Sequence, residues 1–120
     1  MTRRPEQRLD DIEDAIGRIR FGMAALDSGL ADPQADLARD AVLYRLLVIG
    51  EAARALPDPV RDSVPDLPWR NIVRLRDLLA HQYHRVDVGI IHATCDAPLT
   101  QLHDALPQLR TAAAEWQSGR

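Results

Sequence analysis

Apolar residues recur at helical spacing through the first part of the chain, and this pattern constrains the fold more than any other feature. They follow one another every three or four positions, at Leu9, Ile12, Ile16, Ile19, Met23 and Leu26. Residues at this spacing line one face of a helix. Four acidic residues between positions 10 and 14 lie near its start, where the helix dipole favours negative charge. We therefore expect a first helix from Pro5 to Leu26.

A second long helix is predicted after a loop at Asp27–Asp32. Asp32 has the residue type of an N-cap, and Pro33 suits the first helical position. Pro57 sets the end of this helix near Leu56. Its apolar residues are spread over more than one side: Leu37, Ala41, Leu43, Tyr44, Leu46, Leu47, Val48, Ile49 and Ala52. Because a helix of this kind contacts more than one neighbour, we predict that one of its faces forms a homodimer interface.

Prolines divide the next part of the chain. The segment between positions 57 and 68 contains four of them and leaves room for one short turn at Val60–Ser63. A third helix is predicted from near Pro68 to a point between His81 and Tyr83, since Trp69 begins a run of apolar residues at helical spacing.

The last part of the chain is also predicted to be helical. Asp87 is a candidate cap for a helix from Val88, and Pro98, Pro107 or both would break or kink that helix. No segment has the alternating pattern and length of a convincing strand. The sequence therefore predicts an all-α fold: a single domain over residues 1–120, built as an antiparallel bundle of four or five helices.

Composition limits the compartment and the class of protein. The 120 residues are 46% hydrophobic, which is ordinary for a globular domain, and no apolar run approaches the ~20 residues needed to span a bilayer. No apolar segment follows the basic N-terminus, so we expect no secretory signal. The single cysteine, Cys95, fits a reducing compartment. We expect a cytoplasmic protein with no membrane contact.

The charge is unevenly distributed. A formal net charge of −3 argues against a protein that coats nucleic acid non-specifically. Between Arg61 and Arg85, however, the sequence has five arginines against three aspartates, a balance of +2, and it also has His81 and His84. We predict a basic surface in this region.

The segment from Arg76 to Tyr83 combines residues suited to phosphate chemistry. Arginine binds phosphate through a planar fork of donors, and histidine exchanges protons near neutral pH. Arg76 and Tyr83 are seven residues apart and share a helix face, whereas His81 joins that face only if the helix loosens toward its end. Arg76 and His81 beside one phosphate would suffice to cleave RNA without a metal. The alternative is structural: both cations complement the helix dipole, and Tyr83 packs.

These residues form the pattern R-x4-H-x-Y, which resembles the HepT-like toxin family of the HEPN superfamily. Three other segments resemble that family: Ile49–Ala53 its I-G-E-A segment, Pro65–Arg70 its proline–tryptophan helix entry, and Tyr83–Asp87 its Y-x-x-V-D turn. The resemblance extends from about Leu9 to Asp87. Many relatives have asparagine where this chain has Asp77, whose charge would weaken the attraction of the neighbouring arginine for phosphate.

The resemblance implies a function. It implies a homodimeric, metal-independent endoribonuclease toxin of a type II/VII-like toxin–antitoxin pair, which cleaves RNA in a cleft formed by both subunits. Arg76 and His81 would be catalytic. A nucleotidyltransferase antitoxin would silence the toxin by AMPylation of Tyr83, although Tyr83 could also stack on a base or donate to a phosphate. We expect no cofactor.

Three further residues are candidates for supporting roles. Glu51 would orient Arg76 or His81, or would lie in water at the edge of an apolar stripe. Asp77 would pair with a nearby cation or remain solvated, and His84 would lie at the mouth of the cleft. No third ligand accompanies His81 and His84, so we expect no metal site.

Two other functions remain open at this point. The first is a non-catalytic HEPN subunit that binds a minimal nucleotidyltransferase, and the second is a helical interaction module without activity. The Arg76 and His81 pair favours the nuclease, because a binding subunit needs neither residue.

Overall fold

The computed structural model describes residues 3–82, 93 and 96–119. These residues form five helices and no strand: α1 Pro5–Asp27, α2 Gln34–Ala55, α3 Asp58–Asp62, α4 Trp69–Gln82 and α6 Ala97–Ser118. The all-α prediction is therefore confirmed. Among the described helices, none is both long enough and apolar enough to cross a membrane.

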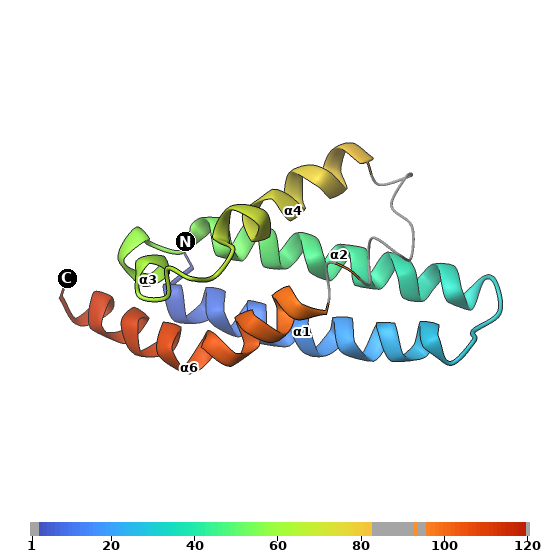
Figure 1. Cartoon of the computed structure of the whole chain (residues 1–120), viewed down its shortest axis with the longest axis horizontal. Helices are drawn as coiled ribbons and strands as arrows, with labels where there is room; N and C mark the ends of the chain where they lie inside the picture. Colours follow the sequence, from blue (N-terminus) through green and yellow to red (C-terminus); the bar gives the residue numbers. More distant parts are fainter. Residues whose placement is uncertain (1–2, 83–92, 94–95, 120) are drawn as a thin grey trace.

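Helices α1 and α2 form an antiparallel hairpin that is the base of the fold (Figure 1). The predicted apolar face of α1 is buried, and the helix begins at Pro5 as expected and ends at Asp27. The two helices approach closely at Gly22, where an added Cβ would lie 2.6 Å from the Val42 Cγ2 atom. Gly29 has a φ of 85° in the connecting turn, a backbone conformation that glycine adopts without steric cost.

The start of α2 differs from the prediction. Pro33, not Asp32, is the N-cap, and no side-chain hydrogen bond caps the helix. Backbone carbonyls take the place of the predicted carboxylate: the Ala35 N–H donates to the Ala31 oxygen at 3.0 Å and the Leu37 N–H to the Pro33 oxygen at 3.1 Å. Donors of the first turn are thus satisfied without a side-chain cap.

Helix α3 occupies the proline-rich segment, slightly ahead of the predicted turn at Val60–Ser63. After it, the indole Nε1 of Trp69 donates a hydrogen bond to the Val64 carbonyl at 2.9 Å. This bond fixes the first residue of α4 to the preceding turn, and α4 then packs against α2.

The two late prolines have different effects. Pro98 lies in the first turn of α6, where the missing N–H costs nothing, so the predicted break falls there. Pro107 lies inside α6 without ending it, and the ribbon bends along the middle of that helix (Figure 1). Asp87 and the helix predicted from Val88 lie outside the described residues.

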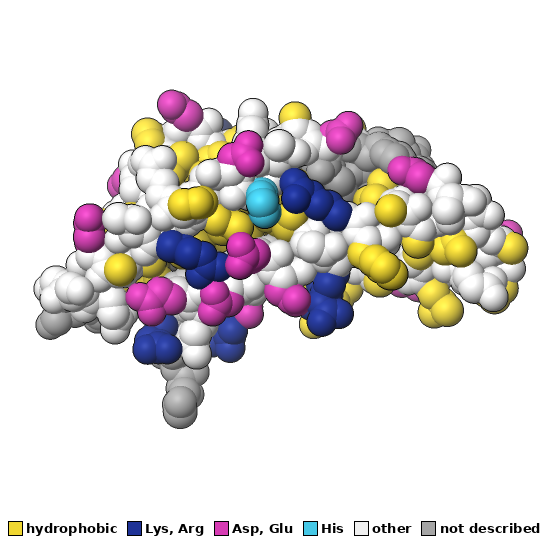
Figure 2. All heavy atoms as spheres, turned by 90° about the horizontal axis from the view of Figure 1, so that it is seen from below, with side chains coloured by type: hydrophobic (Ala, Val, Ile, Leu, Met, Phe, Trp, Pro, Cys, Tyr) yellow, Lys and Arg dark blue, Asp and Glu magenta, His cyan; other side chains and the backbone are white. Residues whose placement is uncertain are grey.

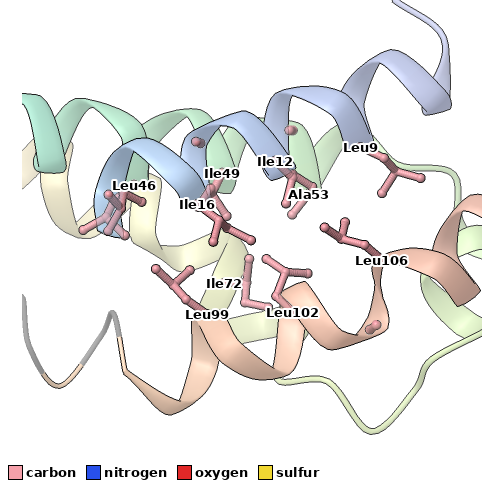
Figure 3. Close-up of a cluster of buried hydrophobic side chains, with 14 of the residues drawn as sticks. Leu9, Ile12, Ile16, Leu46, Ile49, Ala53, Ile72, Leu99, Leu102 and Leu106 are labelled. Carbon is pink, nitrogen blue, oxygen red and sulfur yellow. The ribbon is translucent and has the colours of Figure 1, made fainter. Parts of the chain in front are cut away.

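The core lies where four helices meet. Side chains from α1, α2, α4 and α6 point toward one another there (Figure 3). Ile12, Ile49, Leu102 and Leu109 are each 0% exposed, and Ile72 of α4 is 4% exposed. Burial of each such side chain contributes roughly 1.5–3 kcal/mol. The core therefore provides a rigid support for α4.

Polar contacts join α6 to the rest of the bundle. The two terminal nitrogens of Arg110 donate to the Asp10 carboxylate at 2.8 Å and to the Glu13 carboxylate at 3.0 Å. The Gln108 amide donates to the Ser63 carbonyl at 2.9 Å. Helix α6 is thus held against both α1 and α3.

Candidate active site on helix α4

Both residues of the predicted catalytic pair lie on α4. Its first half is fixed to the core, because Ile72 is buried and Trp69, Val73 and Leu75 pack partly buried against the core. Its C-terminal end points away from α2 (Figure 1). The helix that carries the motif is therefore fixed to the core at its N-terminal end.

The helical register separates the two motif positions. Helix α4 remains α-helical through Gln82, so the loosening that would align Arg76 with His81 does not occur up to that residue. Five residues correspond to a rotation of about 500°, which leaves the two positions about 140° apart around the axis. The Arg76 position follows buried Ile72 by four residues, and the His81 position follows exposed Arg74 by seven. One helix does not place both positions on the same face.

The described side chains on the outer side of α4 are mostly basic or polar. Arg70, Asn71, Arg74 and Asp77 are all exposed. Neither Arg70 nor Arg74 makes an ion pair or hydrogen bond within the part of the chain that the structure describes. The predicted basic surface is present at these two positions. In contrast, Arg61 pairs with Asp58 at 2.6 Å.

The remaining candidate residues are only partly described. Glu51 is exposed on α2, which removes the desolvation cost expected for an acid on an apolar stripe, and its role in orienting the motif stays a prediction. The Asp77 carboxylate is exposed as well. Tyr83 and His84 lie outside the described residues.

A hollow borders the inner edge of α4. It has a volume of 420 Å³ and is lined mainly by apolar side chains of α2, α4 and α6, among them Ile49, Leu75 and Leu99. Asn71 and Arg74 contribute the polar groups among its described lining residues. Sequence analysis did not predict this hollow, because it depends on how three helices separated in the chain are packed.

No cluster of metal ligands occurs among the described residues: they hold no group of three or more His, Cys, Asp or Glu side chains suited to a metal ion. The side chains of His81 and His84, the pair considered from the sequence, lie outside the described part of the chain.

Helix α2 has an apolar outer face. Leu37 is 69% exposed and Tyr44 is 57% exposed, and exposed Ala41 lies between them in sequence. The Arg45 guanidinium lies 5.2 Å from the centre of the Tyr44 ring. The breadth of apolar residues predicted for α2 is therefore real, while the dimer inferred from it stays a prediction.

Comparisons with known proteins agree with the family resemblance seen in the sequence. The sequence matches the family described as Ribonuclease HepT-like over residues 10–109. It is 31% identical over 112 residues to the "Probable ribonuclease HepT" of Thermococcus cleftensis, a match that covers 92% of this chain and 99% of the relative.

Shorter matches point the same way. A "Putative RNase" of Methanocaldococcus jannaschii is 43% identical over 85 residues, covering 71% of this chain and 64% of that protein. A "Putative RNase" of Caldanaerobacter subterraneus is 33% identical over 79 residues, covering 62% of this chain and 70% of that protein. No solved structure matches the chain. The family match includes α4 and spans most of the sequence, so this chain belongs to the Ribonuclease HepT-like family.

Proposed function

We propose that this protein is a metal-independent endoribonuclease, the toxin of a toxin–antitoxin pair, with Arg76 and His81 as its catalytic residues. The observation that carries the proposal is the R-x4-H-x-Y motif of a family described as ribonucleases. Its support is the position of Arg76 and His81 on α4, the helix that also carries Arg70 and Arg74, which are exposed and have no partner in the described part of the chain.

The proposed reaction uses the RNA's own 2′-hydroxyl as nucleophile. An imidazole removes the hydroxyl proton, and the 2′ oxygen then forms a bond to phosphorus. The bond between phosphorus and the 5′ oxygen breaks, and that oxygen takes up a proton from an imidazolium. The products are a 2′,3′-cyclic phosphate and a 5′-hydroxyl. Arg76 stabilises the negative charge that builds up on the phosphate, so side chains alone supply every function.

This reaction profits from two motifs. One copy has a single motif histidine, whereas a separate acid and base serve the two proton transfers. The register of α4 adds a second reason, because the Arg76 and His81 positions of one helix lie on different sides. A symmetric dimer would complete the site by combining Arg76 of one copy with His81 of the other.

The outer face of α2 is the proposed dimer interface, since exposed Leu37 and Tyr44 offer an apolar patch to a second copy. Light scattering should give a dimer for the parent protein and a monomer for the double variant Leu37→Glu, Tyr44→Glu. The exposed variant Gln34→Glu, also on α2, is the matched control and should remain dimeric. A parent that is monomeric at micromolar concentration would refute the interface.

Cleavage of single-stranded RNA in the presence of EDTA tests the nuclease assignment. The parent protein should leave 2′,3′-cyclic phosphate ends, and Arg76→Ala and His81→Ala should each reduce the rate about 10²–10⁴-fold. Circular dichroism should show unchanged helix content. Arg61→Ala, which removes an arginine outside the motif, should retain activity. Equal activity in the parent and the double variant Arg76→Ala, His81→Ala would exclude the mechanism.

Tyr83 is the proposed control point. An AMP group on its hydroxyl would add bulk and negative charge seven residues from Arg76, on the same helix face if α4 were to continue. A partner nucleotidyltransferase would attach it. After co-expression with that partner, intact-mass measurement should detect added AMP, and Tyr83→Phe should lose it. If the partner silences Tyr83→Phe as well as the parent, inhibition proceeds by binding alone.

A further inference from the structure

Helix α4 differs in charge from every other described helix. It has three arginines against one aspartate, a balance of +2, whereas α1 has six acidic residues against three arginines and α2 has three of each. Helices α3 and α6 are each acidic by one charge. Arg76 and His81 therefore lie on the one described helix with a net positive charge.

Most of the arginines described outside α4 have an acidic partner. Six of the ten form ion pairs with aspartate or glutamate: Arg3, Arg18, Arg39, Arg45, Arg61 and Arg110. Arg4, Arg8, Arg20 and Arg54 form none within the described part of the chain. The face seen from below shows this mixture, with arginine side chains next to acidic ones (Figure 2). Arg70 and Arg74 are exposed and have no such partner in the described part of the chain. An anion that reaches them displaces no protein carboxylate.

The spacing of these two residues aligns them along the axis of α4. Arg70 and Arg74 are four positions apart, so they lie one above the other on the same face, one turn apart. The His81 position follows Arg74 by seven residues and continues the same line, about 10 Å further along the axis, with the exposed Asp77 on that face between them. A chain of phosphates lying along this face would run from Arg70 toward the motif.

We propose that Arg70 and Arg74, together called the arginine strip, bind the phosphate backbone of single-stranded RNA beside the cleaved bond and hold it in line with His81. This inference rests on the proposed function. Guanidinium groups bind phosphate bidentately, and the strip offers two of them in sequence. With a net charge of −3, the protein as a whole repels RNA, so a local strip determines where the strand lies.

The test measures the salt dependence of RNA binding. A labelled single-stranded RNA is titrated by fluorescence anisotropy in a His81→Ala background, which prevents cleavage. Each phosphate contact on a single strand contributes about 0.7 to the slope of log K against log salt, so Arg70→Ala with Arg74→Ala should lower the slope by about 1.4. Between 50 mM and 200 mM salt, the protein with an intact strip should then lose affinity about sevenfold more than the variant.

The matched control removes the same charge elsewhere. Arg39→Ala with Arg61→Ala deletes two arginines that pair with Asp36 and Asp58. The slope should be unchanged in this control. An equal fall in slope for the control would assign the effect to overall charge and overturn the strip. An unchanged slope in the strip variant would overturn it as well.

A short substrate separates binding from catalysis. A dinucleoside monophosphate has one phosphate and does not reach from the motif to Arg74, so the strip variant should cleave it at the parent rate. On a long RNA the strip variant should have a raised KM with little change in kcat. A strip variant that binds RNA normally but no longer binds the antitoxin would make the strip a protein-docking site, which also overturns the inference.

Failure of the proposed function gives a different result. In that case the parent protein neither binds nor cleaves RNA under any of these conditions. If the parent does both and the strip variant equals it, only the inference about Arg70 and Arg74 is wrong.

Discussion

Arginine has different surroundings at the seam between α1 and α6 and on the outer side of α4: it is paired with acids at the seam and has no described partner on α4. At the seam, Arg110 contacts the carboxylates of Asp10 and Glu13, which lie 100 and 97 positions earlier in the chain. On α4, Arg70 and Arg74 face solvent without a described partner. The same residue type thus connects helices in one region and remains available to a ligand in the other, and the surrounding acids decide which role it has.

The largest expected effect is the recovery of RNA cleavage when two inactive variants, one of each kind, are combined in one dimer. Arg76→Ala and His81→Ala should each lose activity about 10²–10⁴-fold. If one Arg76 and one His81 taken from different copies suffice for cleavage, a mixed dimer keeps one intact site of two and recovers about half of the parent rate.

Co-refolding the two variants and measuring RNA cleavage checks this expectation. Two tagged copies allow the mixed dimer to be isolated, with the refolded homodimers of each variant as controls. No recovery in a dimer shown to contain both variants would mean that each site draws both residues from one copy or that cleavage needs both His81 side chains.

Two glycines of α1 offer a matched test of how rigid the base of the bundle is. An added Cβ at Gly22 would lie 2.6 Å from Val42, whereas at Gly17 nothing lies within 4 Å. Gly22→Ala should lower the free energy of unfolding by about 1–3 kcal/mol through overpacking. Gly17→Ala should raise it by about 0.5–1 kcal/mol, because alanine favours a helix.

Urea denaturation measures both values. Equal changes in the two variants would contradict the close approach of α1 and α2. RNA cleavage at a temperature where both variants remain folded should match the parent, since neither residue lies on α4.

Removal of the Arg110 contacts should have a smaller effect. Arg110→Ala deletes two ion pairs whose acidic partners are 66% and 55% exposed, and pairs of this kind contribute roughly 0–1 kcal/mol each. Thermal denaturation should therefore shift slightly, and RNA affinity should not change. A loss of RNA binding in this variant would break the distinction between the two regions.

The smallest expected effect concerns the one acid on α4. Asp77→Asn removes a negative charge from the side that includes Arg70 and Arg74, and at a solvated surface this should strengthen RNA binding about twofold. Anisotropy measurements at low salt check the value. A fall in kcat instead would indicate that Asp77 pairs with a cation of the active site, in line with the pairing predicted for it.

The long helices and the motif helix were predictable because local patterns determine them. The periodicity from Leu9 to Leu26 gave α1 to within one residue at its end, and Pro57 marked the end of α2. The N-cap at Asp32 was wrong, since backbone carbonyls satisfy the first donors of α2 in its place. Sequence alone does not say which of two acceptors a backbone N–H will find.

Features that depend on distant contacts were not predictable. Nothing in the pattern around Arg110 indicates that its partners are Asp10 and Glu13. The hollow beside Ile72 and Leu99 also needs the packed positions of three helices. Within the candidate site, spacing predicted that His81 and Arg76 would lie on different faces of a regular helix. Helix α4 does remain regular through Gln82.

The contacts of Arg110, which join the last helix to the first, also bear on the order in which the bundle folds. During synthesis the α4 segment leaves the ribosome before α6, and at that stage the core still lacks Leu102, Leu106 and Leu109. Closing a loop of about 100 residues is entropically slow compared with pairing α1 and α2. Because the main described contacts of α4 are with α2, α4 can pack on that helix before α6 completes the core.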